Sequence, residues 1–209
     1  MARLWSCGFE LQSVTSGVEV DLVGGSPTIS TTTVRSGAAS LRISSLSSGT
    51  AMNCRGAFQA SAGNGPFYFR YYLRTATRPS AANRIIMLND TANLTAPMAW
   101  IDLLNDGTLT LNDEDGAIGS ASGVLSLDTW YRVEIKFDRT GAAGAHVVEA
   151  MLDGSVFATS SARDISAGIF YYGFGGNLAS EAQTTGDWFF DDLATNDGTG
   201  SFQTGYPGE

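Results

Sequence analysis

The sequence predicts an all-β protein: an antiparallel β-sandwich of about a dozen strands in one domain. Two observations support this fold class. Short segments that alternate between apolar and polar residues recur along the chain, and turn-forming residues separate them, with 25 glycines among 209 residues. No segment shows the spacing of apolar side chains that an amphipathic helix requires.

The expected strands follow one another with Gly, Pro, Asn or Asp residues in the connections. The first half of the chain contributes residues 4–10, 18–23, 28–34 continuing into 35–43, 51–58, 67–74 and 84–89. The second half contributes residues 99–104, 108–112, 130–138, 146–152, 155–159, 169–175 and 187–194. Residues 105–107 read Asn-Asp-Gly and predict a tight turn between two of these strands.

Residues 130–138 give the clearest strand pattern. One face carries the apolar residues Tyr131, Val133, Ile135 and Phe137, and polar residues lie between them. The next strand, residues 146–152, ends at Asp153-Gly154, a dipeptide that favours a two-residue hairpin turn. These two features predict neighbouring antiparallel strands.

Residues 67–74 alternate in the same way, but both of their faces contain aromatic rings. One face is apolar and is expected in the core: Phe67, Phe69, Tyr71 and Leu73. The other face is amphipathic and is expected to line the concave sheet: Tyr68, Arg70, Tyr72 and Arg74.

Residues 130–135 (Trp-Tyr-x-Val-x-Ile) and 148–154 (Val-x-x-x-Leu-Asp-Gly) resemble the core of the concanavalin A-like and laminin G-like jelly rolls. Residues 7–10, 34–43 and 188–193 resemble segments of β-sandwich carbohydrate-binding modules and of jelly-roll proteins from tailed bacteriophages. The resemblance spans most of the chain. It implies a jelly roll over residues 1–193, followed by a glycine-rich C-terminal arm over residues 194–209.

The charge of the chain excludes some function classes. The net charge is −9, which repels phosphate backbones, so nucleic-acid binding is not expected. No apolar run reaches the roughly 18 residues of a membrane span. The first residues lack the continuous apolar stretch of a secretory signal. The sequence therefore predicts neither a signal peptide nor a transmembrane segment.

Cys7 and Cys54 are the two cysteines of the chain. Two cysteines in a chain of this length do not form a disulfide scaffold. They are expected to be either small buried apolar residues or one bridge between neighbouring strands.

The residue pattern predicts that the chain is not an enzyme. The resembling glucanases carry Glu-x-Asp-x-x-Glu on one strand, and this sequence has no such run. Asp191 and Asp192 are adjacent, so strand alternation is expected to point them to opposite sides. His146 is the single histidine and is expected at the solvated start of a strand.

A structural calcium ion is one expectation from the resemblance, because related sandwiches often join their first and last strands through a hard cation. Glu10, Asp191 and Asp192 stand at the matching positions. The alternative is that these carboxylates cap turns by accepting backbone hydrogen bonds.

A glycan site is a second expectation. Such sites combine an aromatic platform with groups that bond hydroxyls. The residues that would supply one, if their strands neighbour each other on the concave sheet, are Tyr68, Arg70, Tyr72, Trp100 and Asp102. The alternative places these aromatic residues in the core or in a subunit interface.

An assembly role is a third expectation. Phe202 and Tyr206 are isolated aromatic residues in the glycine-rich arm, and they could anchor a neighbouring subunit. The alternative is a frayed terminus.

The fold and these sites together predict a non-enzymatic virion protein of a tailed phage, either a capsid decoration or a tail-associated protein. It would be made in the host cytoplasm and would pack, as a homo-oligomer, with other virion proteins on a symmetric assembly. The alternative function is a carbohydrate-binding module, or a lectin-like adhesin, that recognises a glycan.

Overall fold

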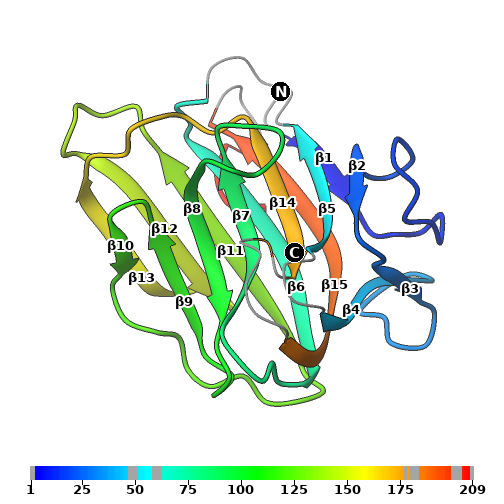
Figure 1. Cartoon of the computed structure of the whole chain (residues 1–209). Helices are drawn as coiled ribbons and strands as arrows, with labels where there is room; N and C mark the ends of the chain where they lie inside the picture. The colour runs from blue at the N-terminus through cyan, green and yellow to red at the C-terminus, as the bar shows by residue number, and fades with distance from the viewer. Residues whose placement is uncertain are drawn as a thin grey trace.

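The computed structural model describes residues 3–46, 51–57, 63–176, 178, 184–198 and 204–207. These residues form fifteen β-strands and no helix, so none of them belongs to a helix able to cross a membrane. The strands build two antiparallel sheets that lie face to face, with the seven-stranded sheet in front of the eight-stranded sheet in Figure 1. The predicted antiparallel β-sandwich is confirmed.

The eight-stranded sheet contains the two strands with the clearest sequence patterns, β6 and β11, as direct neighbours. Its order is β13 (Ser155–Arg163), β12 (His146–Leu152), β11 (Trp130–Asp138), β6 (Phe67–Thr77), β15 (Thr184–Asp197), β4 (Ser40–Leu46) and β3 (Thr28–Ser30), and β1 (Arg3–Cys7) also pairs with β15.

The seven-stranded sheet covers the other side of the core. Its order is β10 (Gly116–Ile118), β9 (Leu109–Asp113), β8 (Pro97–Leu103), β7 (Asn83–Asn89), β14 (Tyr171–Gly176), β5 (Met52–Ala57) and β2 (Leu22–Gly24).

Several strand boundaries differ from the prediction. β1 ends at Cys7, and the left-handed backbone of Phe9, with φ 58°, turns the chain away from the extended conformation. β2 keeps only three residues, and the short strand β10 was not predicted. β15 continues to Asp197, so residues 194–197 belong to the sheet and not to an arm.

The predicted turns are confirmed. Asp153 and Gly154 have φ angles of 50° and 80°, which is the left-handed pair of a type I′ turn, and they join β12 to β13. Gly107, with φ 88°, lies in the turn between β8 and β9. Glycine is favoured at this position because a side chain disfavours that φ.

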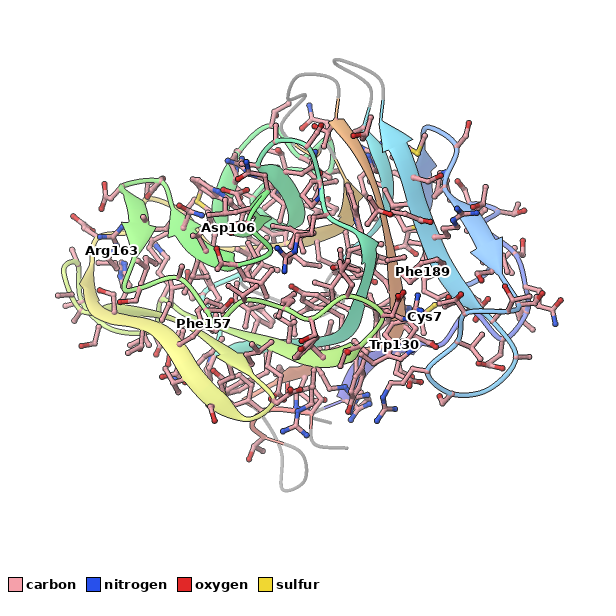
Figure 2. The ribbon with its side chains drawn as sticks, turned by 90° about the horizontal axis from the view of Figure 1, so that it is seen from below. Cys7, Asp106, Trp130, Phe157, Arg163 and Phe189 are labelled. Atoms are coloured by element: carbon pink, nitrogen blue, oxygen red, sulfur yellow. The ribbon has the colours of Figure 1, made fainter. Side chains whose placement is uncertain are left out.

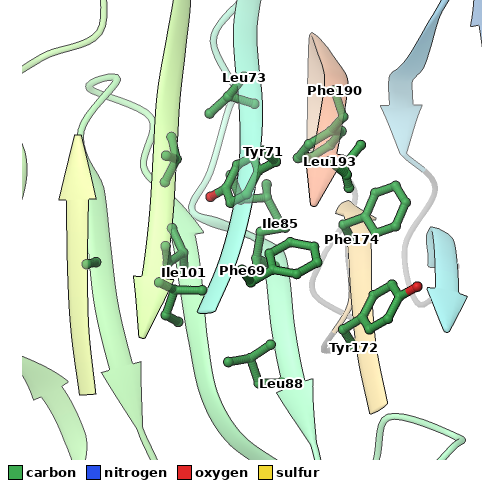
Figure 3. Packing of buried hydrophobic residues seen from close by; sticks show 14 of the residues in the cluster. Phe69, Tyr71, Leu73, Ile85, Leu88, Ile101, Tyr172, Phe174, Phe190 and Leu193 are labelled. Carbon is green, nitrogen blue, oxygen red and sulfur yellow. The ribbon is translucent and has the colours of Figure 1, made fainter. Parts of the chain in front are cut away.

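The core lies between the two sheets (Figure 3). The apolar side of β6 is buried, as predicted, with Tyr71 and Leu73 at 0% exposure. Phe190 on β15 packs against Tyr71 on the same sheet, at 5.6 Å between ring centroids, and against Phe174 on the opposite sheet, at 5.8 Å. The buried Trp188 donates a hydrogen bond from Nε1 to the Gly175 carbonyl, at 2.9 Å, and so connects β15 to β14.

An ion pair joins the two sheets at the edge that contains β13 and β10. Arg163 on β13 donates to both carboxylate oxygens of the fully buried Asp113 on β9. Figure 2 shows Arg163 at the edge of the molecule, well away from Phe189 on β15. This ion pair therefore fixes β13 against the other sheet.

Three residues with reactive side chains are buried. Cys7 and Cys54 are free thiols within the core, which matches the interpretation as small apolar residues, and burial raises the pKa of Cys54 to about 12. His146 is only 3% exposed, and its Nδ1 accepts a hydrogen bond from the Ile165 amide at 2.9 Å. The prediction of a solvated histidine is therefore wrong, because residues 163–165 close over the start of β12.

Truncating the aromatic contact between the sheets should destabilise the fold. We expect Phe190→Ala to lower the free energy of unfolding by about 3–5 kcal/mol, because it leaves a cavity among packed rings. Val156→Ala is the control, since Val156 is 47% exposed and its loss should change stability by no more than about 0.5 kcal/mol. Urea unfolding followed by circular dichroism measures both values, and equal effects would contradict the packing described above.

Candidate functional site

The outward side of the eight-stranded sheet collects basic residues. On β6 and β11, strand alternation points them away from the core, because the residues between them face inward. Arg35 reaches the same side from the loop before β4, where it lies over the Tyr72 ring. Seven of the twelve basic residues of the chain lie on this side, and we call it the arginine face: Arg3, Arg35, Arg42, Arg70, Arg74, Arg132 and Lys136. This concentration is notable in a chain with a net charge of −9.

A groove of about 500 Å³ lies at one end of the arginine face. Phe189 on β15 forms part of its lining, and the register places Arg42 of β4 and Arg74 of β6 directly opposite Phe189 on its two neighbouring strands. Their guanidinium carbons lie 5.8 and 5.5 Å from the centroid of the Phe189 ring. Phe189 is only 4% exposed, so the groove presents two cations that lie against a buried aromatic ring.

Carboxylates orient both arginines. Arg42 donates from Nε and Nη2 to the two carboxylate oxygens of Asp187, at 2.9 and 2.8 Å. This hydrogen-bonded pair raises the pKa of Arg42. Arg74 Nη2 lies 2.7 Å from Asp128 Oδ1. The Nη1 group of Arg42 is not part of its ion pair, and planar guanidinium groups held in this way suit carboxylate and hydroxyl oxygens.

Tyr72 is not an open platform. It is only 5% exposed, because the Arg35 guanidinium lies over its ring at 3.5 Å from the centroid. Arg35 is held in turn by Asp192, through a 2.7 Å contact between Nη1 and Oδ2. Tyr72 thus supports an arginine and does not itself present a ring to solvent.

The residues predicted to bind calcium lie close together, since β1 pairs with β15. Glu10 and Asp192 line a hollow of about 390 Å³ with Glu19 and Arg70. Asp192 has a φ of 47° and lies in a β-bulge of β15. The inserted residue breaks the alternation, so Asp191 and Asp192 both point to the loop around Arg35, and the prediction that they face opposite sides is wrong.

These carboxylates already accept hydrogen bonds. Asp191 Oδ2 accepts from the Arg35 amide at 2.9 Å, and Glu10 Oε2 accepts from the Ala38 amide at 2.8 Å. Burial raises the pKa of Asp191 to about 6. Within the part of the chain that the structure describes, no three His, Cys, Asp or Glu side chains are placed to hold a metal ion. The arrangement fits the capping interpretation, and the calcium site stays a prediction.

The residues predicted to bind a glycan do not form one site. Tyr68, Arg70 and Tyr72 lie on β6 of the eight-stranded sheet, whereas Trp100 and Asp102 lie on β8 of the other sheet. The condition for one shared site, that these strands neighbour each other, is therefore not met, because the chain crosses between the sheets after β6.

On the outer side of the seven-stranded sheet, Trp100 is part of a closed network. Its Nε1 donates to Asp102 Oδ2 at 3.1 Å, and the Arg84 guanidinium covers its ring at 3.9 Å. Burial raises the pKa of Asp102, and the Arg84 charge opposes this shift. These contacts hold the three side chains to one another rather than presenting them to a ligand.

Tyr206 contacts its own chain. Its hydroxyl donates to Glu149 Oε1 on β12 at 2.8 Å, and its ring packs against Tyr68 at 5.0 Å between centroids. Phe202 lies outside the described residues. The role of both residues in assembly stays a prediction.

Sequence reasoning did not predict most residues of this face as part of a site, among them Arg42, Phe189, Glu149 and Asn196. Phe189 could have been found from the alternation in Trp188-Phe189-Phe190, because its two neighbours are buried and it must face outward. The other three become visible only when the strand order is known.

Comparison with solved structures shows proteins of the same fold. The structure of endo-β-1,4-glucuronan lyase from the fungus Trichoderma reesei matches with a TM-score of 0.63 and 11% identity, over 93% of this chain and 95% of that one. Cellulose induced protein Cip1 matches with a TM-score of 0.63 and 18% identity, over 91% of this chain and 95% of that one. A structure of botulinum neurotoxin type C, described with two ganglioside molecules, matches with a TM-score of 0.60 and 11% identity, over 93% of this chain and 47% of that one. No family model and no curated protein matches the sequence.

The prediction that the chain is not an enzyme is corrected by this comparison. A polysaccharide lyase shares the fold over nearly its whole length, and the prediction had tested only the paired carboxylates of glycoside hydrolases. Lyases cleave by elimination and do not need that pair. None of these three structures is described as a virion protein, so they give the phage prediction no support.

Removing divalent cations provides the test for calcium. We expect the melting temperature to be the same with a chelator and with added calcium, because backbone and arginine donors already satisfy Asp191 and Asp192. Differential scanning calorimetry measures both midpoints. A clear rise with calcium that is absent in Glu10→Gln would establish the cation site instead.

Proposed function

We propose that this chain binds an acidic polysaccharide across the arginine face. The row formed by Arg42, Phe189 and Arg74 carries the proposal, because it lines a groove with two oriented cations on either side of one ring. Carboxylates of a uronate chain would accept from the two guanidinium groups, which the buried Phe189 ring supports from below.

The charge distribution favours an acidic ligand over a neutral one. The chain as a whole is acidic, yet most of its basic residues occupy this one surface. Each ion pair on the face orients its guanidinium before a ligand arrives, which lowers the entropy lost on binding. Carboxylates pair with five of the seven cations, so the attraction for an acidic ligand would act at short range, through individual cationic groups.

The proteins with similar structures are consistent with a glycan ligand. They include a lyase of glucuronan and a neurotoxin described with gangliosides. These proteins support the alternative function, glycan recognition, better than a structural role in a phage particle. The sequence also predicted a homo-oligomer. That prediction does not depend on the ligand, and light scattering tests it.

Binding should depend on the two arginines beside Phe189. We expect Arg42→Ala and Arg74→Ala each to weaken binding of a glucuronic acid oligosaccharide about tenfold or more, because each removes charge-assisted hydrogen bonds. Isothermal titration calorimetry measures the dissociation constants, and affinity should fall with added salt.

Arg55→Ala is the matched control, because Arg55 lies on β5 of the opposite sheet. We expect this variant to bind as the wild type does. Equal affinity for a neutral cello-oligosaccharide, or equal effects of all three substitutions, would contradict the proposal.

Cleavage of the same ligand is a second candidate function. Tyr68 and Lys136 lie directly opposite each other on β6 and β11, beside Arg70. In an elimination, a base removes the proton next to the sugar carboxylate, a C=C bond forms as the glycosidic C–O bond breaks, and the protonated base returns its proton to the leaving oxygen. Nearby cations stabilise the charge that develops on the carboxylate. A tyrosine, a lysine and an arginine supply these groups.

Elimination leaves an unsaturated sugar that absorbs ultraviolet light. We expect polyglucuronate to gain this absorbance with wild-type protein, and Tyr68→Phe to lower the rate about 100-fold or more, because only the hydroxyl is lost. Binding at the Phe189 groove should survive in Tyr68→Phe. An unchanged rate in this variant would exclude Tyr68 as the base, and no absorbance change with the wild type would leave binding as the function.

A further inference from the structure

Residues 204–207, near the C-terminal end of the chain, lie across the centre of the arginine face. Asn196 Nδ2 donates to the Gly205 carbonyl at 2.9 Å, and Arg70 Nη1 donates to the Pro207 carbonyl at 3.1 Å. Tyr206 lies between these two contacts, with its hydroxyl on Glu149 and its ring against Tyr68. Pro207 is buried, so the segment is seated on the sheet.

The surface beneath this segment is polar. Arg70, Asn196 and Glu149 meet the segment through hydrogen bonds, and Tyr68 supplies the one aromatic contact. Burial, followed by the hydrogen bond to Glu149, raises the pKa of Tyr206, so its hydroxyl stays protonated and donates. An apolar strap would instead cover apolar residues.

The contacts of this segment correspond to the groups of a sugar acid. The Pro207 carbonyl oxygen accepts from Arg70, as a carboxylate oxygen would, and the Gly205 carbonyl oxygen accepts from Asn196, as a sugar hydroxyl oxygen would. One hydroxyl donates to Glu149, as a sugar hydroxyl would, and one ring packs on Tyr68, as the apolar face of a pyranose would.

We propose that residues 204–207 occupy a subsite for a uronate unit, and that the polysaccharide must displace them to cross the arginine face. The inference rests on the function proposed above and extends it from the Phe189 groove to the centre of the sheet. Arg70 remains oriented after displacement, because its Nη2 also donates to the Asp192 carbonyl at 3.1 Å. The subsite is therefore already built when the ligand arrives.

The competition is intramolecular. The Gly198 amide donates to the Pro66 carbonyl at 2.9 Å, which fixes the chain at the end of β15 only six positions before Thr204. A segment tethered at so short a distance has a high effective concentration at its seat. The apparent affinity for the ligand is reduced by the fraction of molecules in which the seat is open.

Weakening the segment should strengthen ligand binding. We expect Tyr206→Ala to bind a glucuronic acid oligosaccharide about tenfold more tightly than the wild type, because it loses both the ring contact and the hydrogen bond. Tyr206→Phe should give a smaller gain, since it keeps the ring. Phe170→Ala is the control: Phe170 is 39% exposed beside β14, on the other sheet, and its loss should not change the affinity.

A second measurement follows the displacement itself. In protein with isotope-labelled tyrosine, the ring resonance of Tyr206 is identified by its absence in Tyr206→Phe. Saturating oligosaccharide should move it to the position of a free tyrosine side chain. If the ligand saturates the protein while Tyr206 keeps its resonance, the displacement is refuted and polysaccharide binding stands.

The remaining outcomes are also decisive. Weaker binding by Tyr206→Ala would show that Tyr206 is part of the ligand site and does not compete for it. If neither the wild type nor Tyr206→Ala binds acidic or neutral oligosaccharides, the proposed function fails, and the competition fails with it.

Discussion

The strict alternation of β6 is the constraint on which both the core and the arginine face depend. Tyr71 and Leu73 are buried against the opposite sheet, so Arg70, Tyr72 and Arg74 must face outward. A shift of one residue in the register would bury the arginines and expose the rings, at a prohibitive cost in desolvation. The packing of the core therefore fixes the position of every cation on β6.

The bulge at Asp192 interrupts strand alternation in β15, next to the loop that carries Arg35. One inserted residue lets two adjacent carboxylates reach the same loop, and that loop places Arg35 over Tyr72. Without the bulge, strand alternation would direct one of the two carboxylates into the core. Burial raises the pKa of the Asp191 carboxyl to about 6. Backbone amides of Arg35 and Asp192 donate to its oxygens and offset part of this desolvation.

The sequence was sufficient for the local structure of the fold. The faces of β6 and β11 and the turn at Asp153-Gly154 follow from period two and from turn chemistry, which act over a few residues. It was not sufficient for the site, because the arginine face joins β4, β6, β11 and β15, which are far apart in the chain. Trp100 was grouped with Tyr72 for the same reason: both face outward, but nothing local shows that their strands lie in different sheets.

Under the proposed function, the net charge of this chain would be a poor guide to the charge of its ligand. A chain with a net charge of −9 would ordinarily repel a polyanion. Here Asp187 and Asp128 orient Arg42 and Arg74, so the acidic residues of the face position its cations while reducing its net charge. Discrimination between glycans would then come from the geometry of individual guanidinium groups, and only weakly from long-range attraction. This explains how the neutral carbonyl oxygen of Pro207 can occupy a donor suited to a carboxylate, since short-range hydrogen bonding determines which group is held there.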